Sequence, residues 1–320
     1  MIAYLYPMHP KNRYAGPHDF PDLARHVPAL ADHFVTTPDG RMSLNFADPK
    51  AVRLLNQALL VRDYGLKHWA IPPGNLCPGV PGRLNYIHAI NDLLKEKAAQ
   101  TLLLSGAEVQ DTEKLKNQGI YGLDVGTGAS LIYPILGLKE YGWRMVGTDV
   151  DATSLKVAGA IAKFNPGLEK NIIVRKQPDK RTIFRNAILP GEYFDFTMCN
   201  PPFFETEQKA QEAAELKWKK LGVKTSNSPT LNFGGQANEL WTEGGEPAFL
   251  RKMINESTKF ARQVGWFTTL VSKKGYLEIA ETEFRRHSIS ETKVIGIGHG
   301  GKLRRILCWR VVPNFASKRS

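Results

Sequence analysis

The chain has 320 residues, of which 42% are hydrophobic and 23% are charged; these proportions are typical of a folded protein and exclude extensive disorder. No apolar run approaches the roughly 18 residues of a membrane span, and the first residues lack the pattern of a secretory signal. The three cysteines, Cys77, Cys199 and Cys308, lack the paired spacing of a zinc site or a disulfide framework. We therefore expect a protein of the cytoplasm or nucleus, without a metal and without a membrane partner.

The net charge of +12 is unevenly distributed along the chain. Residues 251–320 include 15 basic and 5 acidic residues, whereas residues 1–50 include 5 of each. A positive field of this size favours a polyanionic partner such as a nucleic acid, because neutralising phosphates releases counterions. The alternative from charge alone is that the basic surface only keeps the protein soluble.

Residues 1–82 form the first predicted unit, an N-terminal module. They are rich in Pro, His and Asn and contain one helical pattern, over residues 49–64, before a run of Pro and Gly that ends at residue 82. Residues 83–118 are a predicted helical connection, in which the apolar spacing indicates an amphipathic helix over residues 85–97.

From residue 119 to residue 316 the pattern alternates between strands and helices. We predict strands at 120–125, 143–150, 171–175, 193–199, 265–272, 292–297 and 304–312, and helices from about 130 and at 152–164, 247–263 and 275–287. This alternation predicts an α/β fold with a mostly parallel seven-stranded sheet and helices on both faces. Residues 205–245 are polar and lack periodicity, which predicts a long mobile loop.

Two motifs at the ends of the first two strands of this unit indicate a nucleoside ligand. Asp124, Gly126, Gly128 and Ser130 form a turn whose glycines let the backbone approach a ligand closely. A pyrophosphate fingerprint would need glycine where Leu131 stands. An acid about 20 residues beyond such a turn can accept both hydroxyl protons of a ribose. Asp149 occupies that position, so the two motifs together predict S-adenosylmethionine as the cofactor.

The strongest motif follows the fourth strand and consists of Asn200, Pro201, Pro202 and Phe203. The prolines fix the backbone and remove competing donors. The Asn200 amide oxygen and the Pro201 carbonyl can then accept both protons of a planar exocyclic amine, while Phe203 offers a surface for a base flipped out of its stack. These four residues are therefore the predicted catalytic residues, acting by positioning and electrostatics.

In this order, these motifs resemble those of class I methyltransferases, whose Rossmann-like fold the predicted sheet would match. Further segments narrow the resemblance to the methyltransferase-like-16 family, across nearly the whole chain: Lys11-Asn-Arg-Tyr14, Ser43-Leu-Asn-Phe46, Arg83-Leu-Asn-Tyr-Ile-His88, Gly126-Thr-Gly-Ala-Ser130, Cys199-Asn-Pro-Pro-Phe-Phe204 and Glu243-Gly-Gly-Glu246. That family methylates adenosine N6 in structured RNA, notably U6 small nuclear RNA, and is related to bacterial enzymes that modify an adenine of large-subunit ribosomal RNA. Its vertebrate members carry a C-terminal extension with further RNA-binding modules, and we expect this chain to correspond to their catalytic portion.

The resemblance also implies roles for single residues. Arg83 would bind the carboxylate of the cofactor, Gly126 would contact it through its backbone, Asp149 would hold its ribose, and Thr182 would lie in a loop beside it. Asn200 would contact both cofactor and substrate. Among the residues expected to contact RNA, Lys11, Arg13 and Asn45 lie in segments that carry the resemblance, and Phe204 adds to the aromatic surface of the motif. The others are expected from the local positive charge: Lys176, Lys180, Arg181, Lys302, Arg304 and Arg305.

Methylation of adenosine N6 in U6 small nuclear RNA is thus the main functional prediction from sequence. Three alternatives stay open: methylation of a ribosomal RNA adenine, methylation of a protein glutamine, and RNA binding without catalysis. The intact motif at Asn200 argues against the last alternative. The net charge would be unexplained by a protein substrate, and enzymes that modify glutamine usually end the motif in Tyr, whereas this chain has Phe203.

Overall fold

A computed structural model of the chain describes residues 8–73, 75–105, 119–202, 204–206, 208–209, 242–299 and 302–312, without the side chains of 97–105, 299 and 302. Among the helices in these ranges, none combines the length and apolar character that crossing a membrane requires. The same ranges hold no group of three or more His, Cys, Asp or Glu residues that could bind a metal ion.

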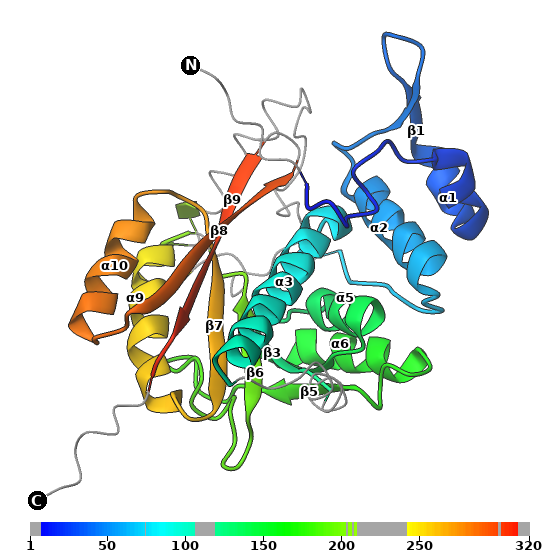
Figure 1. Cartoon of the computed structure of the whole chain (residues 1–320). Helices are drawn as coiled ribbons and strands as arrows, with labels where there is room; N and C mark the ends of the chain where they lie inside the picture. Colours follow the sequence, from blue (N-terminus) through cyan, green and yellow to red (C-terminus); the bar gives the residue numbers. More distant parts are fainter. Residues whose placement is uncertain are drawn as a thin grey trace, which may run out of the picture.

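Seven strands form one sheet in the order β5-β4-β3-β6-β7-β9-β8 (Figure 1). Their bounds are β3 (Tyr121–Val125), β4 (Arg144–Asp149), β5 (Ile172–Lys176), β6 (Phe194–Cys199), β7 (Val264–Val271), β8 (Glu291–His299) and β9 (Lys302–Arg310). β3 to β7 pair in parallel, and β9 runs antiparallel to both β7 and β8. The predicted α/β fold with a mostly parallel sheet is confirmed. Strand order reverses at β3, whose neighbours are β4 and β6, and such switch points are where open α/β sheets bind ligands.

Helices cover both faces of this sheet, as Figure 1 shows. One face carries α3 (Val80–Ser105), α5 (Ile132–Tyr141) and α6 (Ala152–Phe164), and the other carries α9 (Gly245–Ser257) and α10 (Tyr276–Arg286). The alternation of side chains along β9 matches this arrangement, because Ile306 and Cys308 belong to one buried cluster and Leu307 and Trp309 belong to another.

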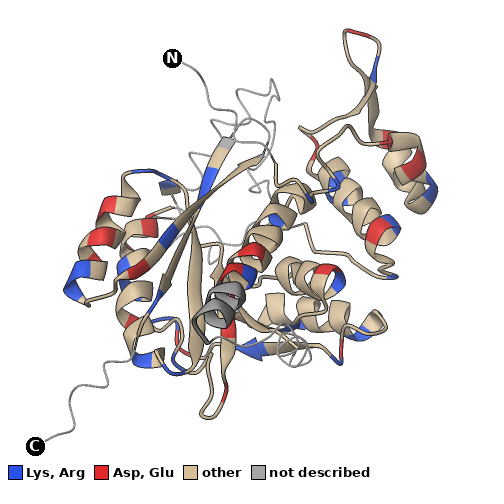
Figure 2. Cartoon of the chain, in the orientation of Figure 1, with Lys and Arg blue, Asp and Glu red and all other residues tan. Residues whose placement is uncertain are grey.

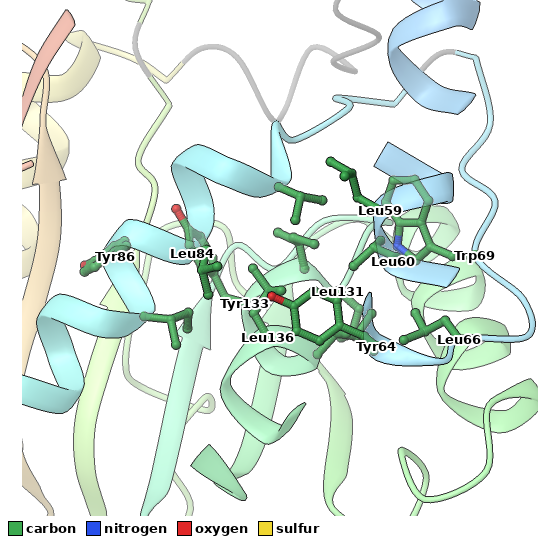
Figure 3. Close-up of a cluster of buried hydrophobic side chains, with 14 of the residues drawn as sticks. Leu59, Leu60, Tyr64, Leu66, Trp69, Leu84, Tyr86, Leu131, Tyr133 and Leu136 are labelled. Atoms are coloured by element: carbon green, nitrogen blue, oxygen red, sulfur yellow. The ribbon is translucent and has the colours of Figure 1, made fainter. Parts of the chain in front are cut away.

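The N-terminal part of the chain packs against the first of these faces. It consists of α1 (Phe20–His26), the 3₁₀ helix η1 (Pro28–His33), a hairpin of β1 (Phe34–Thr36) and β2 (Met42–Leu44), and α2 (Pro49–Tyr64). Leu59, Leu60 and Trp69 from this part lie in one buried cluster with Leu131 and Tyr133 from the sheet region (Figure 3). The two predicted units therefore share a hydrophobic core.

Two helices have the predicted bounds and a third does not. α2 and α6 span residues 49–64 and 152–164, as predicted, each with an aspartate as its N-cap. The helix predicted over 85–97 instead begins at Val80, so it crosses the boundary predicted at residue 82. Its early start has a physical reason, because the side-chain oxygen of Asn56 accepts the backbone N–H of Val80 at 2.8 Å. Most of the loop predicted over 205–245 lies outside the described residues, and α9 begins at Gly245, before the predicted 247.

Candidate active site

The glycine turn after β3 is tied to β4 through its backbone. Gly126 and Gly128 have φ angles of +75° and +61°, a conformation that glycine adopts without strain. The N–H groups of Gly126 and Thr127 both donate to the carbonyl of Thr148 at 2.9 Å. The turn therefore has a fixed position at the carboxyl edge of the sheet.

Asp149 ends β4 beside this turn and is fixed by backbone donors. Its Oδ2 accepts the N–H of Gly128 at 2.9 Å, and its Oδ1 accepts the N–H of Asp151 at 2.9 Å. Burial raises the pKa of this carboxyl above its ordinary value. Each carboxylate oxygen can accept more than one hydrogen bond, so both retain capacity for ligand hydroxyls.

Asn200 follows β6 and lies within reach of Arg83 from α3. The Arg83 Nη1 donates to Asn200 Oδ1 over a long 3.4 Å, and the guanidinium lies over the Tyr133 ring at 5.5 Å from its centroid. Pro201 is buried next to Asn200. Phe203, the fourth predicted catalytic residue, lies outside the described residues. The Phe204 carbonyl accepts the N–H of Thr242 at 3.0 Å, which connects the end of the motif to the segment before α9.

A cavity of about 800 Å³ unites these groups at the switch point of the sheet. The predicted site residues in its wall are Arg83, Gly126, Gly128, Ser130, Asp149, Thr182, Asn200 and Pro202. Lys180 and Arg181, two of the residues expected to contact RNA, also line this cavity. The structure thus brings the cofactor and catalytic predictions together in one place.

Asp124 is the one predicted cofactor residue that is not among the residues lining the cavity. It is 1% exposed, and burial raises its pKa to about 7. Its two carboxylate oxygens, Thr127 Oγ1 and the Tyr133 hydroxyl are buried without a hydrogen-bond partner in the described ranges. Unpaired buried acceptors beside a cavity suit a ligand that carries positive charge, because such a ligand would compensate them. The sulfonium and ammonium groups of S-adenosylmethionine provide that charge, so the residues present fit this cofactor.

A loop over residues 177–185 forms one wall of the cavity and depends on two residues that the sequence did not indicate. Glu256 of α9 accepts the backbone N–H groups of Ile183, Phe184 and Arg185 at 2.8, 3.1 and 2.7 Å. Gln177 donates from Nε2 to the carbonyl of Arg185 at 2.8 Å and to that of Ile183 at 3.2 Å. Neither residue lies in a motif, so no local signal could have identified it.

Glu246 has a comparable role at the start of α9. It is 1% exposed and accepts hydrogen bonds from the Ser272 hydroxyl and, at 2.7 Å, from the Ser272 backbone N–H. This contact joins α9 to the chain just after β7, at the edge of the sheet where the cavity opens. Burial raises the pKa of this carboxyl.

The RNA-contact predictions near the N-terminus fall on side chains that pair with acids of the protein. Arg13 donates to Glu140 at 2.7 Å and lies over the Tyr64 ring at 5.0 Å, while Lys11 lies 3.7 Å from Asp92. Between them, Asn12 is buried and donates to Asn85 and to the Pro81 carbonyl at 2.7 and 2.8 Å. This segment is therefore anchored to α3.

The other RNA-contact predictions occupy separate places. Asn45 is exposed after β2, and Lys176 is exposed at the end of β5. Arg304 and Arg305 lie on β9, and Figure 2 shows Lys and Arg residues along β8 and β9. The Lys302 side chain lies outside what the structure describes. Arg304 lies near the cavity, because burial and the charge of Arg83 in the cavity wall lower its pKa. Asn45, Lys176 and Arg305 are not among the residues that line the cavity.

Several known proteins are similar to this chain in sequence over most of its length. A family model described as RNA methyltransferase matches residues 2–312. The ribosomal RNA large subunit methyltransferase F of Psychrobacter arcticus is 43% identical over 319 residues, which are 95% of this chain and 90% of that protein. Its namesake from Pseudomonas aeruginosa is 45% identical over 305 residues, which are 95% of this chain and 87% of that protein.

Two solved structures share the fold over nearly their full length. The METTL16 catalytic domain in complex with hairpin 6 of the MAT2A 3′ untranslated region is 32% identical, with a TM-score of 0.75, covering 96% of this chain and 98% of that one. The N-terminal domain of human METTL16 in complex with SAH is 31% identical, with a TM-score of 0.73, covering 96% of this chain and 99% of that one. SAH is the demethylated product of S-adenosylmethionine.

Proposed function

Because the chain belongs to this family of RNA methyltransferases and uses S-adenosylmethionine as its cofactor, we propose that it methylates N6 of an adenine in large-subunit ribosomal RNA. The proposal depends above all on one observation: Asn200 and Pro202 share a single cavity with Asp149 and the glycine turn. This arrangement supports the proposal, because a group that can accept an amine and a site for a nucleoside would then lie side by side.

The choice of RNA rests on the relatives. Those that are 42–45% identical carry the name of a ribosomal RNA large subunit methyltransferase, whereas the METTL16 structures are 29–33% identical. U6 small nuclear RNA, the main expectation from sequence, has no support among the relatives of higher identity. We therefore adopt the ribosomal RNA alternative. A protein glutamine as substrate has no support in a family described by its action on RNA.

The residues of the chain position the reacting amine. When bound, S-adenosylmethionine supplies an electrophilic methyl group on a positively charged sulfur. Asn200 Oδ1 and the Pro201 carbonyl would accept the two amine protons, which turns the nitrogen lone pair toward the methyl group. Asp149 would hold the ribose hydroxyls of the cofactor, and Arg83 would hold its carboxylate as a bidentate donor. Positioning and preorganised acceptors thus supply the rate enhancement.

Deletion of the gene tests the proposal in the organism that encodes the protein. Large-subunit ribosomal RNA from the deletion strain, cut with a nuclease and analysed by mass spectrometry, should lack one methyl group on one adenine. A plasmid with the wild-type gene should restore the methyl group, and a plasmid carrying Asn200→Ala should not. Unchanged ribosomal RNA methylation in the deletion strain would contradict the proposed substrate.

A further inference from the structure

One residue of the N-terminal part reaches the cofactor turn directly. Trp69 is 1% exposed, and its indole Nε1–H donates to the carbonyl of Ser130 at 2.9 Å. Ser130 lines the cavity and closes the turn that contains Gly126 and Gly128. The hydrogen bond therefore joins residues far apart in the sequence at the point where the cofactor turn enters α5.

The backbone conformation of the residue after Ser130 explains why the end of the glycine turn must be held in place. Leu131 is the N-cap of α5, has a φ of +54°, and makes no side-chain capping hydrogen bond. A non-glycine residue in this left-handed conformation is strained and persists only where its surroundings enforce it. Leu131 is fully buried, in the cluster that also contains Leu59, Leu60 and Trp69 (Figure 3). The N-terminal part thus helps to enclose it.

The chain just before Trp69 is itself fixed to the sheet region. Asn165, at the end of α6, accepts the backbone N–H groups of Lys67 and His68 at 2.7 and 3.1 Å. Asn165 Nδ2 also donates to the His68 carbonyl at 2.6 Å. Trp69 is thus held on a short segment whose backbone has a defined position relative to α6, so its indole can act as a rigid donor.

We infer that Trp69 is a positioning residue for cofactor binding: it holds the Ser130 carbonyl and encloses Leu131, and thereby keeps the glycine turn in the shape that receives S-adenosylmethionine. The N-terminal part then contributes to cofactor affinity as well as to any contact with RNA. This role is independent of which RNA the enzyme modifies, so it goes beyond the proposed function. Trp69 does not line the cavity, so it acts through the turn.

The test compares two tryptophan substitutions by titration calorimetry with S-adenosylhomocysteine as the probe. Trp69→Phe removes the indole donor while keeping an aromatic ring. Trp143→Phe is the matched control: Trp143 is also 1% exposed, its Nε1 has no hydrogen-bond partner in the described ranges, and it precedes β4 at the end of the sheet away from the cavity. We expect Trp69→Phe to weaken binding about threefold to tenfold, the effect of one hydrogen bond, and Trp143→Phe to leave affinity within about twofold.

Steady-state kinetics separate positioning from a general structural effect. The KM for S-adenosylmethionine should rise in Trp69→Phe, while kcat at saturating cofactor and the KM for RNA stay near wild type. Equal cofactor affinity in Trp69→Phe and wild type would overturn the inference, as would equal losses in the two variants. If Trp69→Phe fails to fold, the same titration is made with 3-benzothienylalanine at position 69. This residue keeps the ring shape and lacks only the N–H, so the same two outcomes support or overturn the inference. Binding of the probe needs no RNA, so failure here is distinguishable from failure of the proposed substrate.

Discussion

The residues predicted to bind the cofactor and those predicted to contact RNA are held in different ways in this chain. Gly126, Gly128 and Asp149 are fixed by backbone hydrogen bonds at the ends of adjacent parallel strands. Lys11 and Arg13 lie on the surface, where each already has an acidic partner within the protein. Forming the sheet therefore fixes the glycine turn and Asp149 relative to each other, whereas an RNA phosphate would have to compete with a carboxylate for either basic side chain. Substitutions in the two regions should consequently differ in what they change and by how much.

The largest effect is expected at the amine acceptor. Asn200→Ala should lower the rate of methyl transfer by about two to three orders of magnitude, the usual cost of removing an oriented polar group that acts on the transition state. RNA affinity should stay near wild type, because the change removes hydrogen bonds to one flipped base. Single-turnover rates and gel-shift titrations measure the two quantities.

A matched control for this variant is Asn171→Ala. Asn171 lies just before β5, and its side chain donates to the Gly167 carbonyl at 2.9 Å, away from the cavity. Its substitution should leave the rate unchanged. If Asn200→Ala kept more than a tenth of the wild-type rate, the proposed role of Asn200 would be wrong.

The difference between contacts at the ends of neighbouring strands and contacts between distant segments explains which residues can be predicted from the sequence. Asp149 and Asn200 can be identified because each directly follows or ends an apolar strand, and parallel strands bring their carboxyl ends together. Glu256, Gln177 and Trp69 cannot, because their contacts join distant parts of the sequence and no local pattern marks them. The early start of α3 escapes prediction for the same reason, since its capping residue, Asn56, belongs to α2.

The second effect is a pH dependence of cofactor affinity, which we expect to arise from Asp124. Burial raises the pKa of this carboxyl to about 7, so below that pH the free protein holds it neutral. A cationic cofactor binds best to the ionised carboxylate, so affinity should fall up to tenfold for each pH unit below 7 and level off above pH 8. Calorimetric titration with S-adenosylmethionine between pH 5.5 and 8.5, chosen to span that pKa, measures this profile.

The Asp124→Asn substitution should change cofactor affinity and folding stability in opposite directions, which separates the two effects of this carboxyl. A folded-state pKa above the unfolded value means that stability falls as pH rises from about 4 to 7. At pH 8 the substitution should therefore raise the free energy of unfolding of the cofactor-free protein, by about 1 to 4 kcal/mol, while weakening cofactor binding and flattening its pH profile. A pH profile in Asp124→Asn identical to that of wild type would show that another group titrates.

A smaller effect is expected where side chains hold the wall of the cavity. Glu256→Gln removes the charge that accepts three backbone N–H groups of the 177–185 loop. The KM for S-adenosylmethionine should rise about threefold to tenfold, because hydrogen bonds to charged groups contribute about 1.5 to 3 kcal/mol and the loop can relax in part. Initial rates at varied cofactor concentration test this. Glu281→Gln on the exposed side of α10 serves as the control and should leave that KM unchanged.

The smallest effects should separate Lys11 from Arg13. The exposed Lys11 pair with Asp92 contributes little to stability, so Lys11→Glu should leave the melting temperature near wild type and reduce RNA affinity a few-fold. Arg13→Glu places a second carboxylate beside Glu140, so it should also lower the melting temperature by a few degrees. Melting curves and RNA titrations at several salt concentrations measure both quantities.

The salt dependence decides whether Lys11 binds a phosphate. The slope of log affinity against log salt should become shallower by about 0.7 to 0.9 for each phosphate that the variant no longer neutralises. If Lys11→Glu left RNA affinity and this slope unchanged, the N-terminal segment would serve only as a structural cover on the core. Cofactor binding should persist in Lys11→Glu under either outcome.

The purified protein can show whether this cavity transfers a methyl group to an adenine amine of ribosomal RNA. Large-subunit ribosomal RNA from a strain lacking the gene would be incubated with S-adenosylmethionine carrying a labelled methyl group, digested to nucleosides and analysed by mass spectrometry. We expect the label in N6-methyladenosine alone with wild-type protein, and no label with Asn200→Ala. Label in another nucleoside, or in added protein and not in the RNA, would contradict it.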